Sequence, residues 1–273
     1  MVTTQLGGKM SYWQLNVGKN ALSCIQIGKY SKITSKELFT FSTDQVDTWK
    51  SAIGLLQQHL KQKARRAEHL SISLSHAWTR FFTIPWSDDL LDKQKARSYL
   101  TAHFSSIYGD LDDLWEFTFE KREYGAPQIA CALKQEWLAQ LIELSQHCNC
   151  QLHSIAPWSI QAFNHYRLNI GASDAWFAAI EPGFIALSAI RAARVDRIVL
   201  HRYESQTWET ELKRLIRRQN LCESREQPLP VYWISLIKPD GNVMPEEFHQ
   251  LNTDAAMAMS DDADQLNYSL AMQ

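Results

Sequence analysis

Residues 12–27 read YWQLNVGKNALSCIQI. Two stretches rich in strand-forming residues lie on either side of Gly18-Lys19-Asn20, which is typical of a tight turn. The segment therefore predicts a β-hairpin with strands over 12–17 and 21–27. We expect a third strand over 37–42, after which Ser42-Thr43-Asp44 can cap the start of a helix.

A helix is expected next, over residues 45–66. Apolar side chains recur there every three or four positions, at Val46, Trp49, Ile53, Leu56 and Leu60. The basic residues near its end suit the negative end of the helix dipole. A strand over 69–74 completes a unit of the order βββαβ.

The same order of elements returns near the other end of the chain. Two strands are expected on either side of Glu181-Pro182-Gly183, and the full set of predicted elements is strands 175–180, 184–190 and 197–203, helix 206–220 and strand 231–236. The unit βββαβ therefore occurs twice, as a repeat of pattern and not of residue identity.

A third pattern lies between the two units. Its expected elements are strand 81–86, helix 88–107, a hairpin of 115–121 with 128–133, helix 135–147 and strand 151–155. This order, βαββαβ, predicts an inserted ferredoxin-like subdomain. The predicted domains are a flexible N-terminus (1–10), a first lobe (11–80), the insertion (81–156), a linking helix with a second lobe (157–238) and an acidic, disordered tail (239–273).

Composition narrows the class of protein. The chain has 273 residues and a formal net charge of -2, which excludes a dominant basic surface for nucleic acid. The five scattered cysteines are typical of a reducing compartment. The longest apolar stretch, 175–190, is interrupted and shorter than a bilayer span. We therefore expect a cytoplasmic protein without a membrane span, and Met1 and Met10 both remain candidate start residues.

The element order resembles the actin-like fold, which is a duplicated ribonuclease H-like fold. The insertion is placed as in PilM-like and GspL-like proteins of pilus assembly and type II secretion. Local support comes from residues 70–86, LSISLSHAWTRFFTIPW, and residues 150–166, CQLHSIAPWSIQAFNHY. The resemblance implies a scaffold that binds the cytoplasmic tail of an inner-membrane protein in a groove between the large lobe and the inserted domain. We expect a peptide-in-groove contact or strand addition there.

Nucleotide-binding members of this fold carry an Asp-x-Gly turn in each lobe. Here the acid position before Gly18 is Asn16, which brings no charge to balance Mg²⁺. Ala179 stands at the second acid position, unless a register shift recruits Glu181. We therefore expect no nucleotide and no metal cofactor.

Two other interpretations stay open. One is a nucleotide-binding ATPase or kinase-type switch of the same fold, with phosphate surrounded by Asn16, Gly18, Lys19, Glu181 and Gly183. The other is an unrelated α/β binding protein. A metal site within 147–153, HCNCQLH, is not expected because the ligand spacing is wrong for zinc.

Three tryptophans at segment edges, Trp78, Trp86 and Trp158, are candidate anchors for a partner protein. The tail has no Lys or Arg after Lys238, whereas the helix over 206–220 carries four basic residues on its outer side. One hypothesis is that tail and helix attract each other, within a chain or between chains. A homodimer is also allowed.

Overall fold

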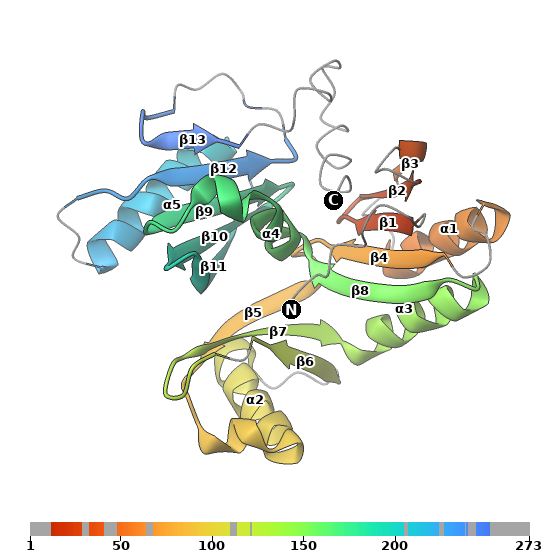
Figure 1. The fold of residues 1–273 in the computed structure, drawn as a ribbon, viewed down its shortest axis with the longest axis horizontal. Coiled ribbons are helices and arrows are strands. Elements are labelled where there is room, and N and C mark those ends of the chain that lie inside the picture. The colour runs from red at the N-terminus through yellow and green to blue at the C-terminus, as the bar shows by residue number, and fades with distance from the viewer. Residues whose placement is uncertain are drawn as a thin grey trace.

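A computed structural model describes residues 12–28, 33–40, 48–63, 68–109, 114–120, 122–204, 207–223, 227–237, 239 and 244–251. These residues form two five-stranded sheets and a three-stranded sheet, with helices packed on them (Figure 1). The predicted N-terminal residues 1–10 and the predicted cap Ser42-Thr43-Asp44 lie outside the described residues. No helix in the described ranges is both long and apolar enough to cross a bilayer.

The first lobe has the strand order β3-β2-β1-β4-β8. Its elements are β1 (Tyr12–Val17), β2 (Ala21–Ile27), β3 (Ile33–Thr40), α1 (Thr48–Lys63), β4 (His69–Leu74), α3 (Gln135–His147) and β8 (Gln151–Pro157). The predicted hairpin is confirmed, since β1 and β2 pair antiparallel from Tyr12–Ile27 to Val17–Leu22. Strand β4 pairs parallel with β1 on one side and with β8 on the other.

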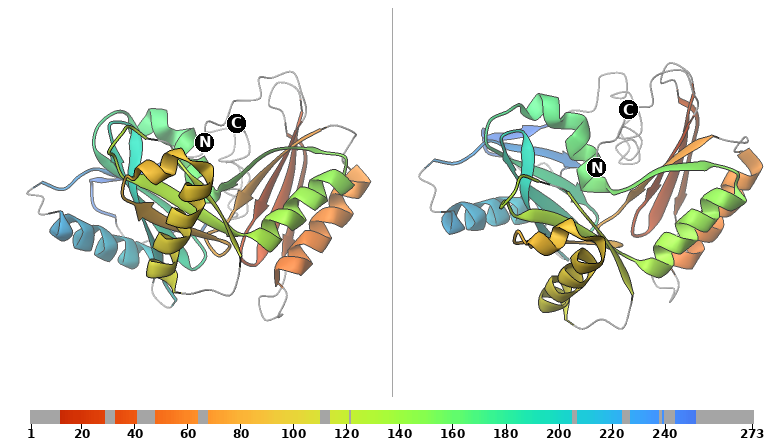
Figure 2. Two further views of the ribbon diagram at one scale, coloured as in Figure 1. Left: turned by 90° about the horizontal axis from the view of Figure 1, so that it is seen from below. Right: turned by 60° about the horizontal axis from the view of Figure 1, so that its bottom comes forward.

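Helices α1 and α3 lie side by side on one face of this sheet (Figure 2). Three residues of the predicted stripe, Trp49, Leu56 and Leu60, are buried in α1. Ala52, which the stripe omits, is also buried, Ile53 is half-buried, and Val46 lies outside the described residues. Leu141 and Leu144 of α3 join the same core. Burying each leucine contributes about 1.5–3 kcal/mol, so packing on the sheet holds both helices.

The second lobe repeats this arrangement with the order β11-β10-β9-β12-β13. Its elements are β9 (Ala175–Glu181), β10 (Phe184–Arg191), β11 (Arg194–Arg202), α5 (Trp208–Cys222), β12 (Val231–Ser235) and β13 (Phe248–Gln250). Strands β12 and β13 pair parallel, as β4 and β8 do. Helix α4 (Trp158–Ile170) follows β8 directly and contacts both large sheets.

The small sheet has three strands in the order β5-β7-β6. It contains β5 (Thr79–Ile84), β6 (Trp115–Phe119) and β7 (Gln128–Lys134), covered by the 3-10 turn η2 (Asp88–Leu91) and by α2 (Lys93–Tyr108). The other face contributes Phe81 and Ile129 to the core around α4.

Two sequence predictions are wrong, and for the same reason. The insertion is βαββ, not the ferredoxin-like βαββαβ, because α3 packs on α1 and β8 pairs with β4 of the first lobe. The predicted disordered tail 239–273 contains β13, which pairs with β12 of the second lobe. Each lobe therefore has a fifth, parallel strand that the repeat βββαβ omits. Residues 252–273 lie outside the described residues.

Candidate functional site

Two of the predicted phosphate residues, Gly18 and Glu181, contact the turn that joins β4 to β5. This turn comprises residues 75–78, and we call it the interlobe turn. In the first lobe, Val17 O accepts from the Ser75 backbone N–H at 2.9 Å. The Trp78 indole Nε1 donates to Gly18 O at 3.0 Å. The β1–β2 hairpin is therefore fastened to the interlobe turn by two hydrogen bonds.

Glu181 reaches the same turn from the second lobe. Its Oε1 accepts from Ser75 Oγ at 2.9 Å and from the His76 backbone N–H at 2.7 Å. Glu181 is 2% exposed. Burial raises the pKa of its carboxyl to about 7, although the bonds from His76 and Ser75 oppose that rise. The Glu181 carboxyl group therefore connects the second lobe to the interlobe turn.

His76 is fully buried beside Phe81, at 5.6 Å between ring centroids. Burial lowers the pKa of its imidazole to about 3, so the ring is neutral at physiological pH. Among the described residues, neither of its ring nitrogens has a hydrogen-bond partner. The sequence predicts no functional role for Ser75 or His76, because no glycine beside them creates the sharp turn of a nucleophile. The available signal was a pair of polar residues directly after a buried strand.

The remaining predicted phosphate residues have local structural roles. Asn16 Nδ2 donates to Ser23 Oγ at 2.8 Å, and these two residues are direct cross-strand partners. A Cβ on Gly18 would lie 2.7 Å from Ala21 O, so the turn itself requires glycine. Gly183 has a φ of 82°, which suits glycine in the turn between β9 and β10. Lys19 is exposed.

The three candidate tryptophans are not brought together. Trp78 is 8% exposed and packs with Trp49 and Trp137 at ring distances of 5.1 and 5.2 Å. Trp158 is 2% exposed and belongs to the core around α4. Trp86 is half-buried, and its ring centroid lies 4.9 Å from that of the exposed Tyr124. Both residues belong to the small-sheet module, by which we mean the three-stranded sheet with η2 and α2, residues 79–134.

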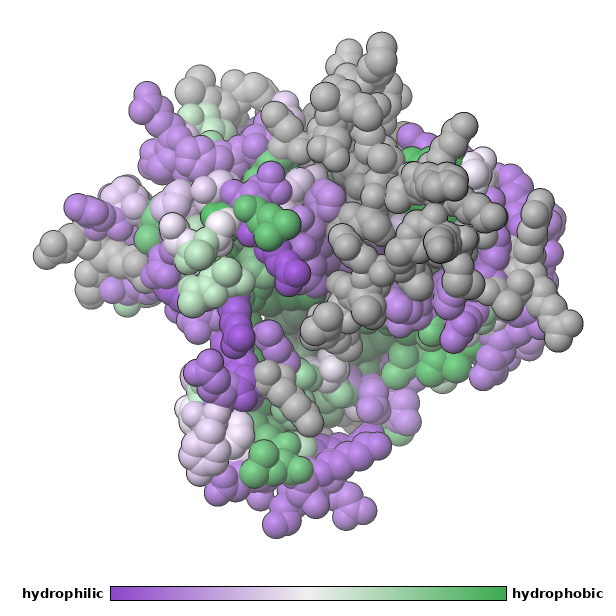
Figure 3. Space-filling model, in the orientation of Figure 1, coloured by the Kyte–Doolittle hydropathy of each residue, from purple (hydrophilic) through white to green (hydrophobic). Residues whose placement is uncertain are grey.

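A pocket of about 340 Å³ lies next to that module's edge strand β6. Its lining is mostly apolar: Leu90, Leu91, Ala96, Leu100, Phe117 and Phe119, with Lys93, Arg97 and Glu116 at the rim. Leu91 is 72% exposed. Figure 3 shows apolar side chains at the surface of this projecting module. An exposed apolar side chain beside an open strand edge suits an extended polypeptide ligand.

The described residues contain no group of three or more His, Cys, Asp or Glu side chains placed to hold a metal ion. Residues 147–153 comprise the end of α3, the turn over 148–150 and the start of β8. Asn149 has a φ of 52°, consistent with its ending the helix.

Comparison with known proteins supports the fold. No protein-family model and no curated protein matches the sequence. One similar solved structure is the cytoplasmic domain of EpsL, an inner-membrane component of the type II secretion system of Vibrio cholerae. It matches with a TM-score of 0.58 at 8% sequence identity, and the match covers 96% of this chain and 94% of that one. A chain of the PilM-PilN type IV pilus biogenesis complex matches with a TM-score of 0.60 at 12% identity, covering 95% and 97%.

A Bacteroides thetaiotaomicron protein described as having an actin-like ATPase fold and unknown function matches with a TM-score of 0.60 at 10% identity, covering 96% of each chain. The matches span nearly the whole of both chains, so they include both lobes and the insertion. At these identities the likeness concerns the fold: this chain has the actin-like, two-lobed fold of the EpsL cytoplasmic domain and the PilM-PilN chain.

Proposed function

We propose that this protein is a non-catalytic, cytoplasmic scaffold of a pilus or secretion assembly, which binds the cytoplasmic segment of an inner-membrane protein. The observation that carries the proposal is the use of Glu181. This carboxylate binds the interlobe turn, and Asn16 replaces the acid of the first lobe. Neither hairpin then offers a carboxylate to position Mg²⁺. The likeness to EpsL and to the PilM-PilN chain supports the assembly role.

The proposed contact site is the small-sheet module. The pocket beside β6 takes apolar side chains of the partner, and the β6 edge pairs with its backbone. Trp86 and Tyr124 contact each other on the same small-sheet module. Trp78 and Trp158 are too deeply buried to touch a partner directly, so we assign them a supporting role in the adjoining cores.

A binding experiment tests the contact site. Labelled peptides from the cytoplasmic segments of inner-membrane pilus and secretion proteins are titrated with the full chain and followed by fluorescence anisotropy. We expect one peptide to bind, and Leu91→Asp to weaken it by at least about tenfold, because a charge then faces the apolar pocket. The matched control is Leu168→Asp on α4, which is 87% exposed and lies outside the pocket. Equal losses in both variants would contradict the site.

Calorimetric titration with Mg-ATP tests the scaffold assignment separately. We expect no saturable binding at millimolar nucleotide, because the carboxylates that would position Mg²⁺ are absent or engaged. Saturable binding that Gly18→Val abolishes in a folded variant would instead favour the nucleotide switch. That outcome contradicts the proposed function whether or not a peptide binds.

A further inference from the structure

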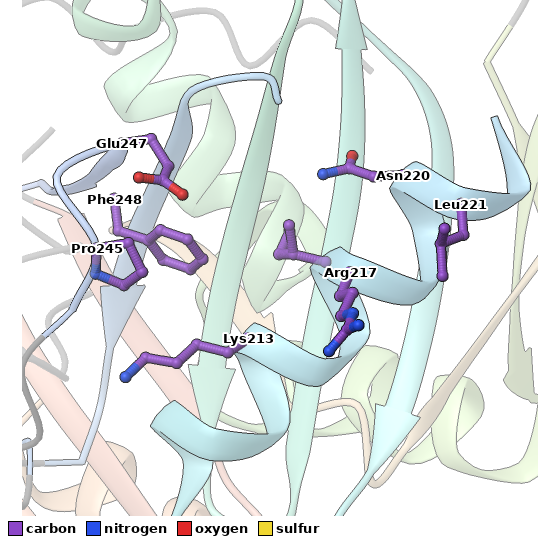
Figure 4. Close-up of a pocket in the computed structure, with 8 residues that line it drawn as sticks. Lys213, Arg217, Asn220, Leu221, Pro245, Glu247 and Phe248 are labelled. Atoms are coloured by element: carbon purple, nitrogen blue, oxygen red, sulfur yellow. The ribbon is translucent and has the colours of Figure 1, made fainter. Parts of the chain in front are cut away.

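A second pocket, of about 570 Å³, lies in the second lobe between α5 and the segment that enters β13 (Figure 4). Its apolar lining consists of Ile216 and Leu221 from α5 and of Pro245 and Phe248 from the facing segment. The Phe248 ring points toward α5, and Lys213 extends toward the segment that holds Pro245. The pocket is separate from the proposed partner site and from the interlobe turn.

The duplication indicates what this pocket corresponds to. In the first lobe, α3 precedes the fifth strand β8 and packs beside α1. Trp49 of α1 stacks on Trp137 of α3 at 5.0 Å, and its Nε1 donates to Gln140 Oε1 at 2.6 Å. In the second lobe, α5 joins the third and fourth strands as α1 does, and β13 is the fifth, parallel strand as β8 is.

The connection between β12 and β13 is too short to supply a counterpart of α3. It comprises residues 236–247, whereas α3 alone has 13 residues. Of this connection, residues 236–237, 239 and 244–247 are described, and none of these is helical. Among the described helices, α5 alone contributes to the core on this face of the sheet. The place beside α5 that corresponds to α3 is therefore the pocket itself.

The apolar side chains of the pocket suit a helix as the ligand. Leu221 is 72% exposed, and it lies in one pocket with Ile216 and Phe248, so it is not an isolated apolar side chain on the surface. An amphipathic helix that packs along α5 covers all three residues, as α3 covers the equivalent flank of α1.

The charges of α5 favour an acidic helix. Its own acidic residues point inward: Glu209 is fully buried, and the buried Glu211 lies 2.9 Å from His201. Among the described residues, no acidic side chain forms an ion pair with Arg217 or Arg218. The basic residues that line or flank the pocket are Lys213, Arg214, Arg217 and Arg218. The α5 wall of the pocket is therefore positive.

The facing wall has the opposite charge, because the exposed Glu247 lines it. A helix with acidic side chains along one edge satisfies the α5 wall and keeps its acids away from Glu247. An anionic bilayer fits less well, since it is uniformly negative and cannot enter a concave pocket. The combination of shape and charge therefore favours a protein helix over a membrane surface.

We propose that this pocket is a second docking site, which binds an acidic, amphipathic α-helix of another protein packed along α5. The helix places apolar side chains on Ile216, Leu221 and Phe248, and its acidic edge faces Lys213 and Arg217. Because the site lies in the second lobe, its partner is independent of the segment proposed for the small-sheet module. A chain with both sites joins two partners.

Two designed peptides test this site on the full chain by fluorescence anisotropy. Both are stapled helices of the length of α3 with leucines on one face; one carries glutamates along one edge, and the other carries lysines there. We expect the glutamate peptide to bind at least about tenfold more tightly than the lysine peptide at low salt. Lys213→Glu with Arg217→Glu should reverse this order.

The matched control is Lys95→Glu with Arg167→Glu, two exposed cations outside the pocket. This variant has the same change in net charge and should keep the wild-type order. Leu91→Asp in the small-sheet module should also leave binding of the glutamate peptide unchanged, so the two proposed sites are tested separately. If the double variant on α5 fails to fold, Arg217→Glu alone makes the same comparison, because Arg217 is exposed.

A spin label on Cys222 reports where the peptide binds. Cys222 follows Leu221 and is the only exposed cysteine of the five, all of which the structure describes. The label should broaden the NMR signals of the bound glutamate peptide. Equal affinity for both peptides, an unreversed order in the folded α5 variant, or binding without broadening would overturn the proposal. Binding of phosphatidylglycerol vesicles that the α5 variant loses, without binding of either peptide, would also overturn it and assign the surface to a membrane.

Discussion

The side chain of Glu181 in the second lobe binds the interlobe turn. Oε1 of Glu181 accepts both hydrogen bonds from the interlobe turn, one from Ser75 Oγ and one from the His76 backbone N–H. A buried carboxylate without a cationic partner is costly, and this is why its pKa rises to about 7. Below that pH the protonated acid keeps both bonds through its carbonyl oxygen.

The pH dependence of stability follows from this shift. The unfolded chain releases the Glu181 proton near pH 4.5, whereas the folded protein releases it near pH 7. Between these values the folded state holds the extra proton, so stability falls as pH rises, by about 3 kcal/mol in total. Glu181→Gln keeps an acceptor oxygen and removes the titration. We expect the variant to match the wild type near about pH 4.5 and to exceed its stability near about pH 8.

Urea unfolding of both proteins across this range measures the difference. His76 titrates in the opposite sense, because its lowered pKa makes stability fall as pH drops from 6.5 toward 3. Since His76 is common to both proteins, its effect cancels in the comparison. The control is Glu204→Gln, whose side chain is 74% exposed. A stability difference that stays constant with pH would contradict the role of Glu181.

At the scale of elements, α3 and β8 belong to the first lobe and not to the insertion. Leu141 of α3 is fully buried in the first-lobe core. Leu141→Ala should destabilise the protein by about 2–5 kcal/mol and speed amide hydrogen exchange in β1, β4 and β8. Exchange in β5, β6 and β7 should change less, since Leu141 lies outside the small-sheet core.

The mirror-image control is Leu100→Ala on α2, which is buried in the small-sheet core. That variant should speed exchange in β5, β6 and β7 more than in β1 and β4. If both variants loosened all three sheets equally, α3 would not belong specifically to the first lobe.

The sequence predicts the elements much better than their pairing. Strands 12–17, 21–27 and 69–74 and helix 135–147 have the expected bounds, because periodicity and turn residues are local signals. The sheet that receives β8 is a long-range property, and a half-buried strand of seven residues fits a ferredoxin-like sheet as well as it fits β4. Strand β13 has only three residues, too few for a pattern.

The candidate site shows the same limit. The sequence places the candidate residues Asn16, Gly18, Glu181 and Gly183 at two predicted hairpins. Both hairpins are present in the structure. It could not show that Glu181 binds Ser75, which lies more than a hundred residues earlier. Such contacts depend on how the two lobes meet, and no local spacing encodes that.

At the scale of the whole molecule, Arg122 connects the small sheet to the second lobe. Its guanidinium donates to Val195 O, and to Asp196 O and Pro127 O at 3.3 Å each. Its side chain is only 9% exposed. The proposed partner site therefore has a defined position relative to β11, the strand that contacts β5.

Arg122→Met should release that connection, because Val195 O then loses a charged donor, at a cost of about 1–3 kcal/mol. We expect hydrogen exchange to rise in residues 194–197 and in 126–128, with β1 and β4 unchanged. The control is Arg194→Met, which removes a mostly exposed charge from the neighbouring position. Equal exchange in the two variants would contradict the role of Arg122.

The return of the chain to the first lobe also sets an order of events during synthesis. Strand β4 ends at Leu74, but its parallel neighbour β8 begins only at Gln151. At about 5–20 residues per second, a ribosome needs about 4–15 seconds to make the intervening segment. Throughout that interval the long edge of β4 has no strand to cover it, and unpaired edges of this kind invite association with other nascent chains. Chaperone demand should therefore peak between the synthesis of these two strands.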